Sequence, residues 1–216
     1  MIKKLKLLII VIFFTSCSTK QVPNQWQYKS TDAFNSYSKN FLKNNKILAK
    51  SYFKTSVKYA KQSANFDQLA RIYLGKCALN KSVDKNYKCI DYNNIKDLAD
   101  SKYLASYYSM LHGDLQTSQI KTLPSQYKLF AKHLYNKQYK SAFDSIKTMQ
   151  QISSKFIAAS LLKDQLNKIQ INYLIKTASF YGYKKLVLFW LEYLKHLESN
   201  LEKKEKLQKK IQILKY

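Results

Sequence analysis

The feature that most constrains the fold is an apolar pattern of helical period that runs from Thr31 almost to the C-terminus. Apolar residues recur at i, i+3, i+4 and i+7, the spacing that places them on one face of an α-helix. The chain has 216 residues but only 3 glycines and 2 prolines, so few residues interrupt this pattern. The sequence therefore predicts an all-α domain.

The predicted helices differ in how clearly their ends are marked. The clearest covers Phe66 to Cys77, because Asn65 supplies an N-cap and the apolar period has no gap. The pattern lapses between Asn80 and Asn93, which predicts a long polar loop. A long helix is expected from Ile95 to Leu111, with Gly113 as its stop signal. The first helix is expected to start at a cap formed by Thr31 and Asp32.

The C-terminal segment from Glu198 onward has a different composition. All the glutamates of the chain lie between positions 192 and 205, and lysines surround them. Glu202 with Lys206, and Glu205 with Lys209, have the i, i+4 spacing and the order that favour ion pairs on a helix. The apolar residues do not keep one heptad phase, so we expect a helix that covers the end of the domain rather than a coiled coil.

Two segments share a turn, then an aromatic residue, then a core residue three positions later. They are N-K-Q-Y-K-S-A around Tyr139 and Y-G-Y-K-K-L around Tyr183. Tyr139 with Ala142, and Tyr183 with Leu186, resemble the start of the second helix in tetratricopeptide repeats. A third such group comprises Ala49, Phe53 and Ser56. The resemblance implies antiparallel helical hairpins stacked as a short TPR-like α-solenoid. An irregular helical bundle is the alternative.

The N-terminus has the organisation of an export signal. Lys3, Lys4 and Lys6 give a basic start, Leu7 to Phe14 is an unbroken apolar run, and Thr15 to Cys17 follows at once. The apolar run is shorter than the roughly 17 to 25 residues that a membrane-spanning helix needs. The sequence therefore favours a cleaved signal over a transmembrane anchor.

The sequence F-T-S-C at this point resembles the lipobox of bacterial lipoproteins. The resemblance implies that residues 1–16 are removed and that Cys17 becomes a lipidated first residue; an ordinary secretory signal is the alternative. In that family a non-acidic residue such as Ser18 goes with sorting to the outer membrane. The resemblance thus implies a cell-envelope protein anchored in the outer membrane and facing the periplasm. Residues 17–30 are expected to form a tether, which leaves 31–216 as the helical-repeat domain.

Catalytic and metal-binding patterns are sparse. Cys77 and Cys89 form an even pair in a chain expected to be exported, which favours a disulfide worth about 3 kcal/mol in the chain-entropy model. The alternative is that Cys77 is a small core residue. His112, His133 and His196 are isolated from each other and from any nucleophile motif. The sequence indicates no metal site, cofactor or small-molecule substrate, and predicts a protein that is not an enzyme.

Charge and aromatic content suggest two kinds of partner. The formal net charge of +25 favours anionic partners, although evenly spread lysines are also typical of a solvated surface. Export makes nucleic acid the least suitable of these partners. A group of tyrosines near the predicted central helices gives the rigid amphipathic contact area that suits protein binding, although each tyrosine can also fill the core. The candidate partner-binding residues are Tyr103, Tyr107, Tyr108, Tyr135 and Tyr139.

These observations lead to two hypotheses of function. The first is a lipid-anchored periplasmic scaffold that binds a protein partner in a cell-envelope assembly. The alternative is direct binding of an anionic envelope polymer or lipid headgroup through the basic surface. Salt separates the two, because polymer binding should collapse between low and moderate ionic strength, whereas binding in a tyrosine-rich groove should persist.

Overall fold

The computed structural model describes residues 25–215, and all regular secondary structure in this range is helical. The prediction of an all-α domain is therefore confirmed. The expected signal, Cys17 and the first part of the expected tether lie outside the described residues. Within the described range, no helix combines the length and apolar character that crossing a membrane requires.

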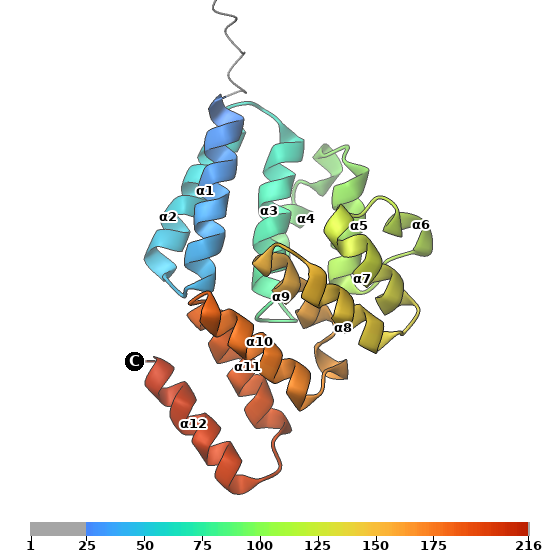
Figure 1. Cartoon of the computed structure of the whole chain (residues 1–216). Coiled ribbons are helices and arrows are strands. Elements are labelled where there is room, and N and C mark those ends of the chain that lie inside the picture. The colour runs from blue at the N-terminus through green and yellow to red at the C-terminus, as the bar shows by residue number, and fades with distance from the viewer. Residues whose placement is uncertain (1–24, 216) are drawn as a thin grey trace, which may run out of the picture.

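The helices follow one another along the chain with short connections (Figure 1). Their bounds are α1 Gln25–Leu42, α2 Lys46–Lys61, α3 Phe66–Lys81, α4 Ile90–Asn93, η1 Lys96–Leu98, α5 Lys102–His112, α6 Thr117–Ile120, α7 Ser125–Tyr135, α8 Tyr139–Thr148, α9 Ile152–Leu161, η2 Lys163–Gln165, α10 Lys168–Phe180, α11 Lys184–Leu197 and α12 Leu201–Lys215.

Helices that are neighbours in sequence pack in pairs, notably α1 with α2, α7 with α8, and α10 with α11. Each of these pairs is joined by a tight turn that contains one residue in the left-handed region. Asn44 has φ of 67°, Lys137 has φ of 56° and Gly182 has φ of 64°. A left-handed residue just after a helix reverses the chain within a few residues, so the second helix returns alongside the first. The result is a set of helical hairpins packed against one another.

Small residues let the N-terminal helices approach closely. Ser30 of α1 and Ser56 of α2 are both fully buried, and each hydroxyl donates to the backbone carbonyl of the other at 3.0 and 2.9 Å. One turn further along α1, Phe34 lies over Gly75 of α3, where an added Cβ would come within 2.5 Å of the ring. Larger residues at 56 or 75 would therefore push these helices apart.

The predicted helix signals hold in several places. The Asn65 side chain accepts a hydrogen bond from the Gln68 amide at 2.9 Å, as an N-cap should. Gly113 ends α5 in the left-handed conformation, with φ of 81°. The C-terminal helix α12 packs on α11 through Ile211, which is fully buried. The predicted pair Glu202 and Lys206 forms at 2.6 Å.

Two predicted helix starts are wrong. The first helix begins at Gln25 rather than Thr31, because the segment from Gln25 to Ser30 has no breaker and Ser30, as part of the helix, makes buried hydrogen bonds with Ser56 of α2. The long helix expected from Ile95 begins only at Lys102. The backbone is extended at Ala99, with ψ of 125°, so Ile95 belongs to a connection formed by α4 and η1. Apolar residues in that connection happen to have helical spacing, which led to the prediction of one longer helix.

Candidate binding groove

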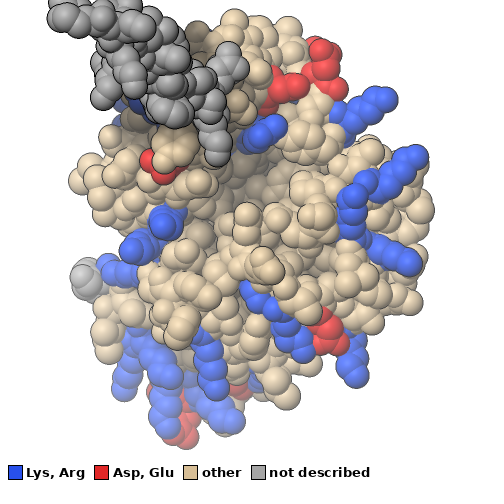
Figure 2. Space-filling view, turned by 45° about the horizontal axis from the view of Figure 1, so that its top comes forward, with Lys and Arg blue, Asp and Glu red and all other residues tan. Residues whose placement is uncertain are grey.

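A groove of about 470 Å³ lies between α1, α3, α5, α7 and α9. These are alternate helices along the chain, so one side of the helical array supplies the whole lining. Arrays of helical hairpins commonly bind their partners on such a surface. The volume lies within the roughly 300 to 1,000 Å³ that is usual for ligand sites. In Figure 2 the recess near the middle of the displayed face is mostly uncharged, and charged side chains stand around it.

The floor of the groove is apolar and rigid. Leu74 of α3, Leu104 of α5 and Ile157 of α9 line it, and each of them is at most 5% exposed. Phe34 forms the wall on the α1 side, where Gly75 allows it to lie against α3. Because these side chains belong to the core of the array, the floor is part of the packing that holds the helices together.

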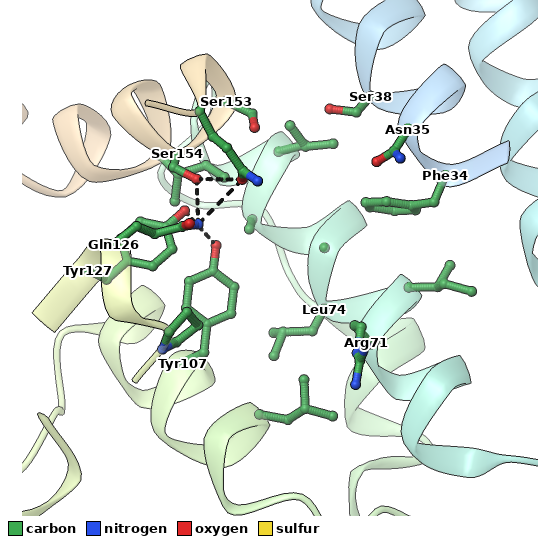
Figure 3. Close-up of a pocket in the computed structure, with 18 of the residues that line it drawn as sticks. Phe34, Asn35, Ser38, Arg71, Leu74, Tyr107, Gln126, Tyr127, Ser153 and Ser154 are labelled. Carbon is green, nitrogen blue, oxygen red and sulfur yellow. Dashed lines mark hydrogen bonds between the residues drawn. The ribbon is translucent and has the colours of Figure 1, made fainter. Parts of the chain in front are cut away.

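One end of the groove carries a hydrogen-bonded network (Figure 3). The Gln126 side chain donates to the Ser154 hydroxyl at 2.8 Å, and that hydroxyl donates to the Gln151 side chain at 3.4 Å. The hydroxyls of Tyr107 and Tyr127 lie 3.2 Å apart. Burial raises the pKa of both tyrosines. They therefore stay neutral at physiological pH and act as hydrogen-bonding groups.

The other end carries a cation. Arg71 of α3 lies with its guanidinium carbon 5.4 Å from the centre of the Tyr103 ring, within cation–π range. Burial raises the pKa of Tyr103, and the nearby Arg71 opposes this effect. Arg71 is the sole arginine of the chain. Among residues 25–215 no carboxylate lies within ion-pair distance of it. Its planar fork of donors is thus available to a carboxylate from outside the chain.

The structure brings two of the five candidate tyrosines into this groove. Tyr103 and Tyr107 are one helical turn apart on α5, so both face the groove. Tyr108 points elsewhere, and its ring centre is 5.0 Å from that of Tyr92 and 4.0 Å from that of His112.

The remaining two candidates lie outside the groove. Tyr139, at the start of α8, lines a separate hollow together with Phe143 and Tyr173. Tyr135 is 51% exposed at the end of α7. The expected cluster is therefore distributed over several places on the molecule.

Sequence reasoning missed most of the groove residues, and among Arg71, Tyr127, Gln126 and Ser154 a signal existed only for Arg71. Arg71 stands out as the single arginine among 38 basic residues. Tyr127 was indistinguishable from a core residue because it continues the apolar stripe of α7. Gln126 and Ser154 carry no pattern, since their role depends on two helices that are distant in sequence.

Cys77 and Cys89 form a disulfide with their Cα atoms 5.2 Å apart, which ties α3 to the start of α4. Both residues are buried. The His112 Nε2 atom lies 3.9 Å from the Cys89 sulfur, and His133 contacts the Gln138 side chain at 2.8 Å. Within residues 25–215 no three His, Cys, Asp or Glu side chains converge as a metal site would need.

Comparisons of the chain with protein-family models, with curated proteins and with solved structures gave no match. The proposals below therefore depend on the sequence pattern and on the geometry of the groove.

Proposed function

We propose that this chain is a lipid-anchored scaffold of the bacterial cell envelope that binds a protein partner in the groove between α1, α3, α5, α7 and α9. The observation that carries the proposal is the order of chemistry along the groove. An amide and hydroxyl network lies at one end, an apolar floor in the middle and Arg71 at the other end. The partner segment would place a carboxylate on Arg71, apolar side chains on the floor and backbone amides against Gln126 and Gln151.

The residue types suit a protein ligand. Tyrosine and arginine are enriched among the residues that dominate protein interfaces, and Tyr103 and Arg71 are already held against each other in the groove. A side chain held in place before binding loses less conformational entropy when the partner arrives. Tyr107 and Tyr127 are fixed in the same way by their mutual contact. The groove therefore offers a preorganised surface.

The proposed location rests on the N-terminal pattern. The basic start, the short apolar run and F-T-S-C support export and lipidation of Cys17. Several acyl chains hold a protein on a membrane far more firmly than one chain does. Mass spectrometry of the protein isolated from membranes should find a mature chain that starts at Cys17 and carries acyl groups. An unmodified Cys17, or a different first residue, would remove the anchor from the proposal.

The groove is tested by photo-crosslinking in intact cells. Benzoylphenylalanine at Asn35, which lines the groove, should yield a discrete protein adduct that persists at moderate salt. The variants Arg71→Ala and Tyr103→Ala should each reduce the adduct by on the order of tenfold, the loss typical of a residue that dominates an interface. Tyr135→Ala is the matched control, because this tyrosine lies outside the groove lining and should leave the adduct unchanged.

Two outcomes would contradict the groove as the binding site. One is an adduct that survives both groove substitutions at full yield. The other is an adduct that disappears equally in the Tyr135→Ala control, since the loss would then be a general effect of removing a tyrosine.

A further inference from the structure

The outer side of α2 carries a row of lysines. Its members recur mainly at every fourth residue, which places successive side chains about 6 Å apart along the helix. At 100° per residue they fall within about one third of the circumference of the helix, and Ile47 falls in the same sector. We call this set the lysine surface; it comprises Lys46, Lys50, Lys54, Lys58, Lys61 and Ile47.

The lysine surface has no internal charge compensation. The chain contains no acidic residue between Asp32 and Asp67. Within residues 25–215, none of the five lysines lies within 4.0 Å of a carboxylate. The nearest lining carboxylate in the adjoining hollow is Asp91, which is already paired with Lys76 at 2.7 Å.

Such a row is unfavourable in the isolated protein. Like charges at i, i+4 on a helix repel each other, and this row contains several such pairs. Nothing in α2 requires lysine for packing, because its buried residues Ala49, Ser56 and Ala60 lie on the side that faces α1. An anionic partner would convert this repulsion into attraction.

Exposed apolar side chains accompany the lysines. Ile47 is 83% exposed in the first turn of α2. The α10/α11 turn lies beside the α1/α2 turn (Figure 1). Lys46 and Lys185 line one hollow, and Lys185 Nζ is 4.4 Å from the centre of the Phe41 ring. This second turn contributes Phe180, which is also 83% exposed.

We infer that the lysine surface docks on the surface of an anionic lipid bilayer. Cations together with exposed aliphatic and aromatic side chains are the combination that interfacial segments use. The lysines would contact lipid phosphates while Ile47 and Phe180 enter the boundary between headgroups and acyl chains. A soluble polyanion would satisfy the lysines but would leave these two apolar side chains in water. The site is separate from the groove and does not depend on the function proposed for the groove.

The test uses the full chain reconstituted into lipid vesicles, with benzoylphenylalanine at Ile47 as a local probe. In vesicles of phosphatidylcholine mixed with phosphatidylglycerol, this probe should form phospholipid adducts that mass spectrometry detects. The same probe at Ile213, which is 77% exposed on α12, is the positional control and should form few. Vesicles of phosphatidylcholine alone, or high salt, should reduce the adduct at Ile47 to the level at Ile213.

Two charge variants distinguish binding through the lysine surface from a general effect of net charge. The triple variant Lys50→Gln, Lys54→Gln, Lys58→Gln should weaken the association of this face with anionic vesicles by on the order of a hundredfold, because each lysine near such a surface contributes about fivefold. The control variant removes the same charge from α12 as Lys203→Gln, Lys206→Gln, Lys210→Gln and should leave the adduct at Ile47 in place. All six lysines are exposed, so both variants should fold, which circular dichroism checks.

Three results would overturn the proposal. They are equal lipid adducts at Ile47 and Ile213, an adduct at Ile47 that is the same in neutral and anionic vesicles, and equal losses from the two triple variants. None of these results bears on the groove, because Arg71 and Tyr103 remain intact in every variant.

Discussion

Helices α2 and α12 have similar lysine contents but differ in their acidic residues. Both are rich in lysine and both lie at the edge of the array (Figure 1). In α12 two of the six lysines pair with a carboxylate: Lys206 contacts Glu202 at 2.6 Å, and Lys215 contacts Glu192 of α11 at 3.0 Å. Helix α2 contains no acidic residue. A lysine-rich composition therefore describes a partly compensated surface in α12 and an uncompensated one in α2.

The two helices also differ in how they are attached. Helix α2 packs closely on α1 through Ala49, Ala60 and the paired serines Ser30 and Ser56. In α12 only Ile211 is fully buried. The lysine surface of α2 is thus fixed to α1 by several buried residues, whereas α12 is held on α11 by one fully buried side chain, with Leu207 and Leu214 partly buried beside it.

The largest expected effect comes from breaking the α1/α2 contact. The variant Ser56→Leu should lower the free energy of unfolding by about 3 kcal/mol, because it overpacks a close helix crossing and removes the hydrogen bond that the Ser56 hydroxyl donates to the buried Ser30 carbonyl. Urea denaturation measures the change. Ser51→Leu places the same side chain at an exposed position of α2 and should change stability by less than about 0.5 kcal/mol. Equal effects of the two variants would contradict a tight α1/α2 contact.

The second effect concerns the attachment of α12. The variant Ile211→Ala should weaken that attachment by about 2 kcal/mol through the loss of a buried side chain. Amide hydrogen exchange should accelerate in α12 while α2 and α3 keep their protection, because the two edge helices are held independently. Ile213→Ala, at a 77% exposed position, is the control. Faster exchange throughout the molecule would show that α12 belongs to the global folding unit.

The contrast between α2 and α12 was only partly visible in the sequence. The confinement of glutamates to the C-terminal region and the i, i+4 spacing of Glu202 and Lys206 follow directly from residue order. The pairing of Lys215 with Glu192 could not be predicted, because it requires α12 to fold back on α11. Local pairs can be predicted from helical period, whereas pairs between helices depend on how the hairpins pack.

The same distinction explains the groove. Helical period is enough to place Tyr103 and Tyr107 on the same face, since they are one turn apart. Periodicity alone could not show that Tyr127 meets Tyr107, or that Ser154 meets Gln126, because each contact joins separate helices. Ile95 shows the opposite error: apolar residues at helical spacing predicted one continuous helix, although the backbone is extended at Ala99.

Acid pH should weaken the attachment of α12 but not that of α2, and this effect should be smaller than that of Ile211→Ala. Hydrogen bonding to Lys195, with a further contribution from Lys215, lowers the pKa of Glu192. A lowered pKa in the folded state means that the stabilisation is present above the unfolded value of about 4.3 and is lost as pH falls through the folded value. Exposure to solvent limits the effect to less than about 1 kcal/mol.

Hydrogen exchange compared above and below this pH window measures the difference. Protection in α12 should fall relative to α2, whose lysines have no carboxylate partner in the described chain. In Glu192→Gln the pH dependence of α12 should be reduced. A pH response of α2 equal to that of α12 would mean that other groups control acid stability.

The smallest expected effect is that removing one lysine charge changes the free energy of unfolding in opposite directions in α2 and in α12. Lys54→Gln removes like-charge contacts with Lys50 and Lys58, so the free energy of unfolding should rise by about 0.5 kcal/mol at low salt. Lys206→Gln removes the ion pair with Glu202, so the free energy of unfolding should fall by about 0.3 kcal/mol. Thermal unfolding at low and high salt measures both, and salt should shrink both changes because both are electrostatic. If Lys54→Gln instead destabilised the protein, the lysines of α2 would be contributing to the fold of the isolated chain, and the argument that they are kept for an anionic partner would lose its physical basis.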